Sequence, residues 1–211
     1  MPKVGMHAVR RDQLIRATVE VIRDHGFADA TIARISRRAG LSGGIIAHYF
    51  GGKNELLVAL MRWLLRELQA ETGQRLRDAD SPPQRIRAII EASFDAEQFK
   101  PGVPQVWLAF YAQIPHEPEL TRLHRVYMRR LQSNLLHAFA QLIPRPAAVD
   151  AAEGMASMID GIYVRAALVE RPLDTGRAHR LMNEYLEMLL GRHDDGFDRR
   201  DPSPPPMETS S

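Results

Sequence analysis

The sequence predicts an all-α protein of nine helices, in which a small N-terminal head precedes a larger helical body. Apolar residues recur at helical spacing over most of the chain, and no segment shows the alternation of a half-buried strand. Short breaks that contain proline or glycine separate the helical segments. At 211 residues, 45% of them hydrophobic and 26% charged, the chain is long enough to bury a core without a structural metal.

Composition excludes several classes of protein. The chain has no cysteine, so disulfides, thiol catalysis and zinc–thiolate sites are excluded. The first residues, MPKVGMHAVRR, lack the apolar core of a signal peptide, and no apolar run reaches the roughly 18 residues of a membrane helix. We therefore expect a cytoplasmic protein with no membrane contact.

Three helices are expected in the head. The first ends where Gly26 interrupts the apolar stripe, and the second follows Thr31, a good N-cap residue. Gly40 breaks the chain again, and Ser42 is predicted to cap the third helix. The predicted helices of the head span residues 10–25, 32–39 and 43–50.

Six further helices are expected in the body, and each is bounded by a proline or glycine break. The first of them carries a wide leucine-rich stripe, as expected of a helix that is buried on one side. These helices are predicted over residues 53–78, 83–99, 103–114, 117–142, 147–170 and 174–191. The polar, proline-rich remainder is predicted to be disordered. The predicted units are a head (1–52), a body (53–191) and a tail (192–211).

Charge is unevenly distributed along the chain. Residues 1–53 carry nine Lys and Arg against four Asp and Glu, a net charge of +5, whereas the remainder carries 19 against 22. A basic end on a mildly acidic body favours contact between the head and a polyanion. A solvated basic helix face would give the same count, so charge alone leaves both interpretations open.

The second and third predicted helices have the spacing of a helix-turn-helix. Gly40 permits the left-handed backbone that the turn needs, and Ala39 and Leu41 are small or apolar where the two helices must touch. In such a motif the third helix would enter the major groove by its N-terminal half. An ordinary helical hairpin is the alternative.

Gly40-Leu41-Ser42-Gly43-Gly44 also matches G-x-S-x-G, the nucleophile elbow of hydrolases. That chemistry needs a strand before the serine, whereas the preceding TIARISRRA reads as an arginine-rich helix. The phosphate-binding and zinc-protease motifs GxxxxGK[ST] and HExxH are absent, as is GxGxxG after a strand. We therefore expect no enzyme activity, no catalytic residue, no metal and no cofactor.

The stretch TIARISRRAGLSGGIIAHYFGGKNELL resembles the DNA-binding signature of the TetR family of bacterial repressors. Further segments resemble the BetI-type, choline-responsive branch of that family: MPKVGMHAVRRDQLI, SFDAEQFKPGVPQVWLAFYA, MIDGIYVRAAL and RPLD. The resemblance covers nearly the whole chain up to about residue 192. Ala47 stands where most of the family has a tyrosine, and the BetI-type pattern shares this departure.

The resemblance implies double-stranded operator DNA as a partner. Phosphate contacts are expected from Thr31, Ser42, Tyr49 and Lys53, although Tyr49 could instead pack in the core. The groove floor would meet Gly43, Gly44, Ile45 and His48, with Ile45 against thymine methyl groups. Arg34 is expected to reach a base edge or a phosphate.

The resemblance also implies a homodimer, because one such head offers few contacts and paired heads reach successive major grooves about 34 Å apart. The last two helices carry apolar faces wider than a single core contact needs. These faces could instead belong wholly to the core of one chain. Their residues are Met155, Met158, Ile159, Ile162, Val164, Leu168, Leu181, Met182, Tyr185, Leu186, Leu189 and Leu190.

The effector implied by the resemblance is a quaternary ammonium compound, choline or betaine aldehyde, which aromatic faces and a carboxylate would hold. The residues expected to bind it are Trp107, Phe110, Tyr111, Phe94, Asp95, Asp160 and Tyr163. The aromatic stripe could instead be ordinary core, and Asp160 could pair with Arg165.

We therefore expect a ligand-responsive repressor of choline-to-glycine-betaine genes that choline or betaine aldehyde releases from its operator. The alternatives are a related repressor of an efflux or catabolic operon that responds to another small molecule and, remotely, a serine hydrolase.

Overall fold

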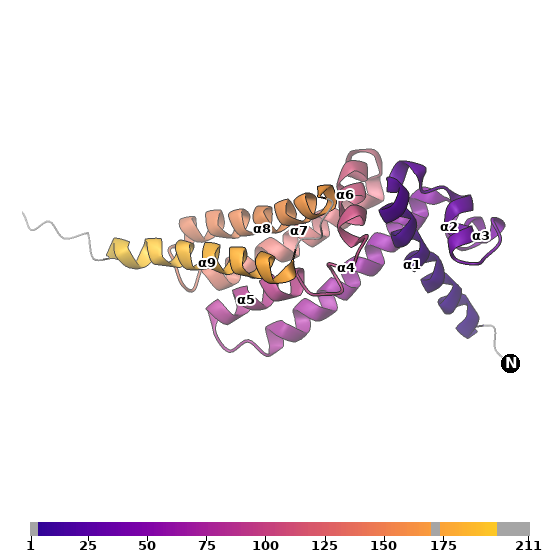
Figure 1. Cartoon of the computed structure of the whole chain (residues 1–211). Helices are drawn as coiled ribbons and strands as arrows, with labels where there is room; N and C mark the ends of the chain where they lie inside the picture. The colour runs from indigo at the N-terminus through magenta and orange to yellow at the C-terminus, as the bar shows by residue number, and fades with distance from the viewer. Residues whose placement is uncertain (1–3, 170–173, 198–211) are drawn as a thin grey trace, which may run out of the picture.

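The computed structural model describes residues 4–169 and 174–197, and within these ranges every regular element is a helix. Three helices form a small head. Figure 1 shows this head at one end of an elongated body. The all-α prediction and the order of nine α-helices are confirmed for the described ranges.

The head contains α1 (Val4–Asp29), α2 (Ile32–Arg38) and α3 (Gly44–Phe50). The backbone of α1 is interrupted at Gly26, whose φ of 72° and ψ of 166° are not helical, so the regular helix ends where the sequence predicted. Thr31 caps α2, because its hydroxyl accepts a hydrogen bond from the Arg34 amide at 3.3 Å. Leu14, Ile35 and Ile46 are buried between the three helices.

The body begins with α4 (Lys53–Arg77), which runs from the head along the length of the body (Figure 1). Eight of its residues are buried, including the leucine stripe predicted from the sequence. The remaining elements are α5 (Pro82–Ser93), α6 (Val103–Gln113), the short 3-10 helix η1 (Ile114–His116), α7 (Pro118–Phe139), α8 (Arg145–Leu168) and α9 (Thr175–Phe197).

Three predicted boundaries are clearly wrong. The first helix, predicted to begin at residue 10, begins at Val4. The helix predicted over 83–99 ends at Ser93, because the Asp95 carboxylate accepts a hydrogen bond from the Glu97 amide at 2.9 Å and stabilises a turn. At the other end of the body, α9 continues to Phe197, so residues 192–197 are helical and do not belong to a disordered tail. Residues 1–3, 170–173 and 198–211 lie outside the described ranges. The first two of these stretches contain parts of MPKVGMHAVRRDQLI and RPLD, two of the segments that carry the family resemblance.

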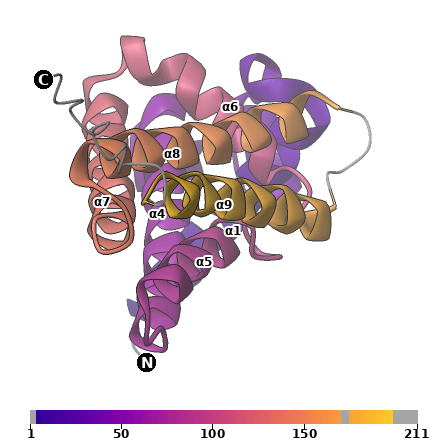
Figure 2. The ribbon, with the colours of Figure 1, turned by 90° about the vertical axis from the view of Figure 1, so that its left-hand side faces the viewer.

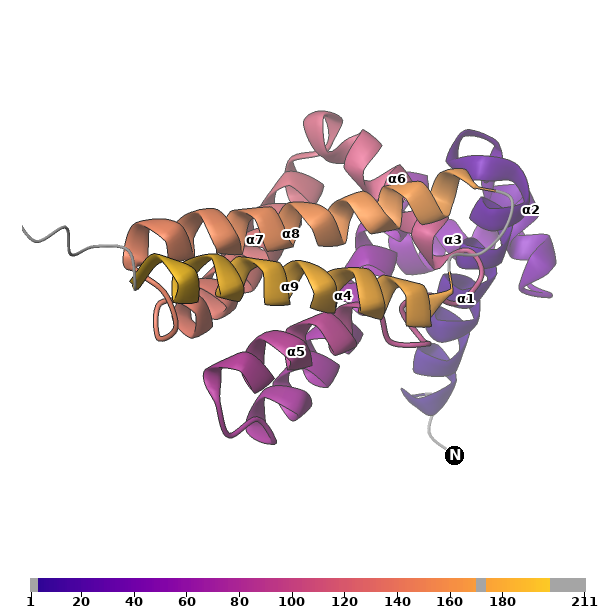
Figure 3. The ribbon, with the colours of Figure 1, turned by 60° about the vertical axis from the view of Figure 1, so that its left-hand side comes forward.

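α8 and α9 lie side by side along the body, as both Figure 2 and Figure 3 show. Met155, Ile159 and Met182 are buried within the chain. Apolar side chains on the same two helices are nevertheless exposed, among them Leu168 at 69% and Met188 at 45%. This pair of helices therefore keeps an apolar face in solvent after the core is complete.

None of the described helices has the length and apolar character required to cross a membrane.

Candidate DNA interface and effector site

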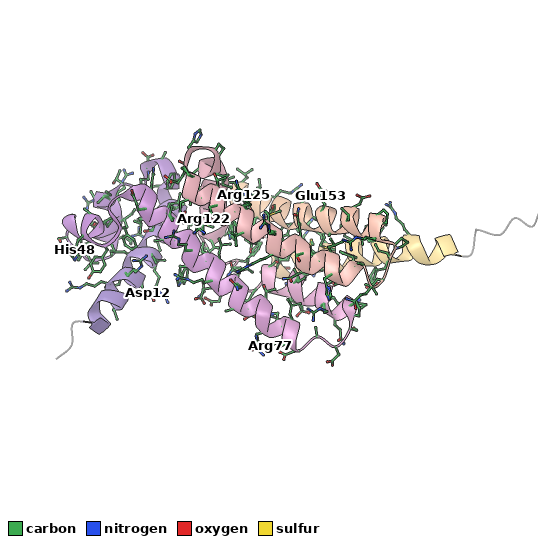
Figure 4. The ribbon with its side chains drawn as sticks, turned by 180° about the vertical axis from the view of Figure 1, so that it is seen from behind. Asp12, His48, Arg77, Arg122, Arg125 and Glu153 are labelled. Atoms are coloured by element: carbon green, nitrogen blue, oxygen red, sulfur yellow. The ribbon has the colours of Figure 1, made fainter. Side chains whose placement is uncertain are left out.

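The α2–turn–α3 unit has the backbone geometry of a helix-turn-helix. Gly40 adopts a positive φ of 67°, which a residue with a side chain rarely adopts. The Leu41 amide donates to the Ser36 carbonyl at 2.9 Å and closes the turn. Ile46 is fully buried, whereas Ala47 and His48 are exposed, so α3 buries one face and presents the other to solvent. Figure 4 shows His48 at the outer edge of the head.

The predicted cap on the third helix is wrong. Gly43 occupies the N-cap position, and no side chain caps this helix. Ser42 contributes its backbone instead, because its carbonyl accepts from the Ile45 amide at 3.1 Å. The Ser42 side chain is exposed in the turn before α3, beside Gly43 and Gly44, which are exposed too.

Gly43 and Gly44 leave the start of α3 without side chains. A Cβ atom added at either position would meet no protein atom within 4 Å. The fold therefore does not need glycine at these two positions. Because Gly43 and Gly44 have no side chains, another molecule can approach the backbone closely, as direct contact with the floor of a DNA groove requires. Ile45 follows them and is half-buried.

The arginines of α2 play different roles. Arg38 donates to Glu20 at 2.9 Å and to Asp24 at 2.8 Å, so it fastens α2 to α1. Hydrogen bonds from Arg23 and Arg38 lower the pKa of Asp24 to about 2. Arg34 donates to the Asp29 carbonyl at 2.8 Å, and Arg37 is exposed. The charge that α2 offers to a polyanion therefore comes from Arg34 and Arg37.

Lys53 is the first residue of α4 and is tied to the end of α1. Its Nζ donates to the Phe27 carbonyl at 2.5 Å and to the Ala28 carbonyl at 3.0 Å, and it lies 4.3 Å from the centroid of the Phe27 ring. Partial burial lowers the pKa of the ammonium group. Lys53 therefore holds the head together, and any phosphate contact is additional to that role.

The two aromatic residues that end α3 are half-buried. Phe50 packs against the core and lies beneath the Arg11 guanidinium, 4.8 Å from the ring centroid. The Tyr49 ring packs edge-on against His48, with 5.2 Å between centroids. Tyr49 therefore contacts both the core and the exposed face of α3.

Aromatic rings gather where α6, α7 and α8 meet. Trp107 of α6 is at the centre, with its ring centroid 5.8 Å from Tyr111, 5.3 Å from Tyr127 and 5.5 Å from Tyr163. Phe110 packs edge-on against the same indole at 5.8 Å. The Trp107 ring is 1% exposed, and its indole N–H has no hydrogen-bond partner among the described residues. We call Trp107, Tyr111, Tyr127 and Tyr163 the aromatic cluster.

Asp160 of α8 faces the aromatic cluster. Its carboxylate accepts a hydrogen bond from the Tyr111 hydroxyl at 2.8 Å. Burial raises the pKa of Asp160, while the hydrogen bond from Tyr111 and the nearby His124 act in the opposite direction. The pKa values of Tyr111, Tyr127 and Tyr163 are raised mainly by burial and further by the charge of Asp160.

No cationic side chain forms an ion pair with Asp160 within the described ranges, so the sequence alternative of pairing with Arg165 is not seen. A buried carboxylate is costly unless a positive charge compensates it. The site therefore has the chemistry to attract a small cation: one partly buried negative charge beside electron-rich rings.

The other expected effector residues are placed differently. Phe94 is fully buried and stacks on Tyr163 at 6.0 Å, behind the aromatic cluster. Asp95 lies 3.4 Å from the Arg75 guanidinium, which also pairs with Glu71 and Glu91, so Asp95 has a cationic neighbour within the chain. Sequence reasoning missed Tyr127, because α7 carries four arginines around it and reads there as a solvated face.

Ring centroids 5.3–5.8 Å apart leave no space for a cation between them. A cation that contacts two opposed rings holds their centroids roughly 9 Å apart or more. The described conformation is therefore a closed one. A cleft of about 680 Å³ between α4, α5 and α7 is lined in part by Tyr127 and Ser93. The Tyr163 hydroxyl donates to the Ser93 carbonyl, so the cleft adjoins the aromatic cluster.

The structure does not give Ser42 the surroundings of a hydrolase nucleophile. A helix precedes this serine, where a nucleophile elbow has a strand. The described residues contain no group of three or more His, Asp or Glu side chains that could hold a metal ion.

Two family models match the chain. Residues 14–60 match the model of bacterial regulatory proteins of the tetR family, and residues 82–191 match the C-terminal model of the BetI-type transcriptional repressor. The first match contains the helix-turn-helix, and the second contains the aromatic cluster and Asp160.

Curated relatives are similar over almost their entire length. The chain is 50% identical to the HTH-type transcriptional regulator BetI 1 of Chromohalobacter salexigens, covering 91% of this chain and 96% of the relative. It is 48% identical to the HTH-type transcriptional regulator BetI of Burkholderia mallei, over 90% and 98% of the two chains.

Solved structures share the fold at lower identity. A TetR transcription regulator from Haloarcula marismortui aligns with a TM-score of 0.71 at 21% identity, over 87% of this chain and 99% of the other. A putative transcriptional regulator from Saccharomonospora viridis, solved in complex with choline, aligns with a TM-score of 0.72 at 16% identity, over 85% and 96%.

Proposed function

The chain belongs to the TetR family of bacterial regulators and to its BetI-type branch, and from this premise we propose that choline or betaine aldehyde releases it from the operator of choline-to-glycine-betaine genes. It is a DNA-binding transcriptional repressor. Regulators of this family bind operator DNA and typically act as dimers.

One observation supports a quaternary ammonium effector above all others: the Asp160 carboxylate lies at the aromatic cluster, bonded to Tyr111, and forms no ion pair with a Lys or Arg side chain among the described residues. A quaternary ammonium donates no classical hydrogen bond, so a carboxylate and ring faces are the groups that select it. Choline and betaine aldehyde each carry one positive charge. Glycine betaine adds a carboxylate, which Asp160 would repel.

A route from the effector to the head runs through α6. Trp107 and Tyr111 lie on this helix, so the rings cannot separate around a ligand without a shift of α6 or its neighbours. The N-cap of α6 is Gly102, where an added Cβ would lie 3.0 Å from Val19 and Arg23 of α1. Because α6 meets α1 this closely, opening of the cluster would displace the head.

We propose that two chains pair through the face of α8 and α9 that stays exposed and apolar. The helices are adjacent, and their exposed side chains include Val149, Leu181 and Met188. Pairing there would fix the separation of the two heads. An effector that changes the position of each head would then mismatch the dimer to successive major grooves.

Calorimetry with choline, betaine aldehyde and glycine betaine tests this proposal. We expect the two monocations to bind at one site per chain and glycine betaine to bind at least about tenfold more weakly. Equal affinity for all three would contradict a site built on Asp160. Binding of none of them, with operator binding intact, would favour a repressor of another operon that responds to a different molecule.

A further inference from the structure

We propose that Glu119 is a positioning residue for operator binding: its carboxylate joins α4 to the start of α7 and so fixes the direction in which α4 holds the head. This role rests on the proposed function, in which the effector-free conformation binds the operator. Glu119 belongs neither to the helix-turn-helix nor to the aromatic cluster, so its effect on DNA binding is indirect.

The Glu119 carboxylate bridges two helices. Arg62 of α4 donates to it, and Arg122 of α7 donates to it through two nitrogen atoms, at 2.9 and 2.7 Å. These hydrogen bonds lower the pKa of Glu119 to about 2, so the carboxylate stays ionised at neutral pH. All three side chains are partly exposed, and ion pairs of this kind add little to the stability of a fold. The bridge therefore acts mainly by holding α4 and α7 in one relative position.

The bridge lies at the border between the head and the body. A cavity of about 330 Å³ separates them there, and its lining includes Arg11 and Phe50 of the head together with Arg62 and Glu119 of the body. Figure 4 shows Arg122 on the part of the body next to the head. On this side the head meets the start of α7 across a space, so the head has room to change its orientation.

α4 connects the bridge to the head. Its first residue, Lys53, is bonded to two backbone carbonyls at the end of α1. Arg62 follows on the same helix, about 14 Å from Lys53 at 1.5 Å per residue. Because a regular helix bends only gently over such a distance, holding α4 at Arg62 restricts the directions that the head can take.

The bridge is also connected to the effector site. Tyr111, which bonds to Asp160, lies two residues before the end of α6. The Thr121 hydroxyl donates to the Ile114 carbonyl at 2.6 Å and ties the first turn of α7 to the end of α6. A shift of α6 that opens the aromatic cluster would therefore reach α7 at the turn that carries Glu119, and the bridge would pass it to α4.

Operator affinity of Glu119→Gln without effector tests the proposal. The substitution removes the charge and keeps the size of the side chain. Because the bridge is formed in the closed, effector-free conformation, we expect the full-length variant to bind the operator about threefold or more weakly than the wild type at the same salt concentration. Electrostatics alone predicts the opposite sign, since loss of a negative charge beside the head favours contact with DNA. Unchanged or tighter binding would overturn the proposal.

The response to choline gives a readout that a purely stabilising role would not change. We expect the ratio of operator affinities without and with saturating choline to be about threefold or more smaller in Glu119→Gln than in the wild type. An unchanged ratio, measured against a wild type that responds to choline, would overturn the proposal. If choline does not affect the wild type, the proposed effector is wrong, and the measurement without effector still decides the role of Glu119.

The matched control is Glu91→Gln. It removes the same charge and breaks the ion pair that joins Arg75 of α4 to α5, at the end of α4 far from the head. We expect this control to change operator affinity by less than about twofold. A loss equal to that of Glu119→Gln would overturn the proposal.

Exchanging the two charges provides a rescue. Glu119→Arg alone places like charges on α4 and α7, whereas Arg62→Glu with Glu119→Arg restores an opposite pair between the two helices. We expect the exchanged pair to recover most of the operator affinity that Glu119→Arg loses. No recovery in a variant that melts like the wild type would overturn the proposal.

Discussion

Replacing Asp160 by asparagine isolates the charge of the effector site. Asparagine has nearly the same shape as aspartate. Its side-chain oxygen can still accept the hydrogen bond that the Tyr111 hydroxyl donates to Asp160 at 2.8 Å in the wild type. The substitution removes the negative charge and replaces the second oxygen by an NH2 group. A quaternary nitrogen about 5 Å from the carboxylate gains about 3 kcal/mol at an effective dielectric constant of about 20. We therefore expect choline affinity to fall about 30- to 150-fold.

The same substitution should stabilise the protein without effector. Burial raises the pKa of Asp160, so its contribution to stability is fully present below the unfolded pKa and is lost as pH rises through the folded pKa. Above its folded pKa the wild type buries a negative charge, whereas asparagine carries no charge to bury. The melting temperature of Asp160→Asn at pH 7 should therefore exceed that of the wild type.

Calorimetry for choline and thermal unfolding without choline check both expectations on one preparation. Operator affinity without effector serves as the control and should not change. Choline affinity equal to that of the wild type would refute the assignment of Asp160, and so would a lower melting temperature at pH 7.

Four further outcomes are expected. In the wild type, choline affinity should fall as pH is lowered through the raised pKa of Asp160, and Asp160→Asn should show no such slope in a calorimetric pH series. Gly44→Ala should raise stability by up to about 1 kcal/mol in thermal unfolding and yet weaken operator binding about tenfold or more, because its Cβ meets no protein atom and would face the DNA. Lys53→Ala should destabilise the head, because two hydrogen bonds to backbone carbonyls are lost. If Lys53 also contacts a phosphate, the variant should lower the slope of log operator affinity against log salt concentration by about one. An unchanged slope would show that Lys53 has a structural role alone. Gly154→Ala should cost about 1 kcal/mol or more in thermal unfolding, because its Cβ would lie 2.5 Å from the Tyr185 hydroxyl, whereas Gly161→Ala, with nothing within 4 Å, should not.

Local signals were sufficient for much of the head. Thr31 caps α2 and Gly40 has the positive φ that the turn requires, and both were predicted from residue type and spacing. The prediction that Ser42 caps the third helix was wrong, although a hydroxyl directly before a helix is by itself a good capping group. Here Gly43 takes the N-cap position, and only the Ser42 backbone bonds to α3.

Long-range contacts decided what local signals could not. The segment after Ser93 has a helical composition, but a turn at Asp95 and the burial of Gln98 end α5 early. Tyr127 looked solvated among its arginines, and only the packing of α7 against α6 brings it to Trp107. Asp95 and Asp160 were equivalent candidates from the sequence. In the structure Asp95 lies 3.4 Å from Arg75 of α4, whereas Asp160 forms no ion pair with a Lys or Arg side chain among the described residues.

Operator binding measured with and without choline tests the central claim most directly. A fluorescently labelled duplex from upstream of choline-oxidation genes would be titrated with the protein at fixed salt, and binding followed by anisotropy. We predict specific binding without effector and at least about tenfold weaker binding in saturating choline. Operator affinity that choline leaves unchanged would contradict the account.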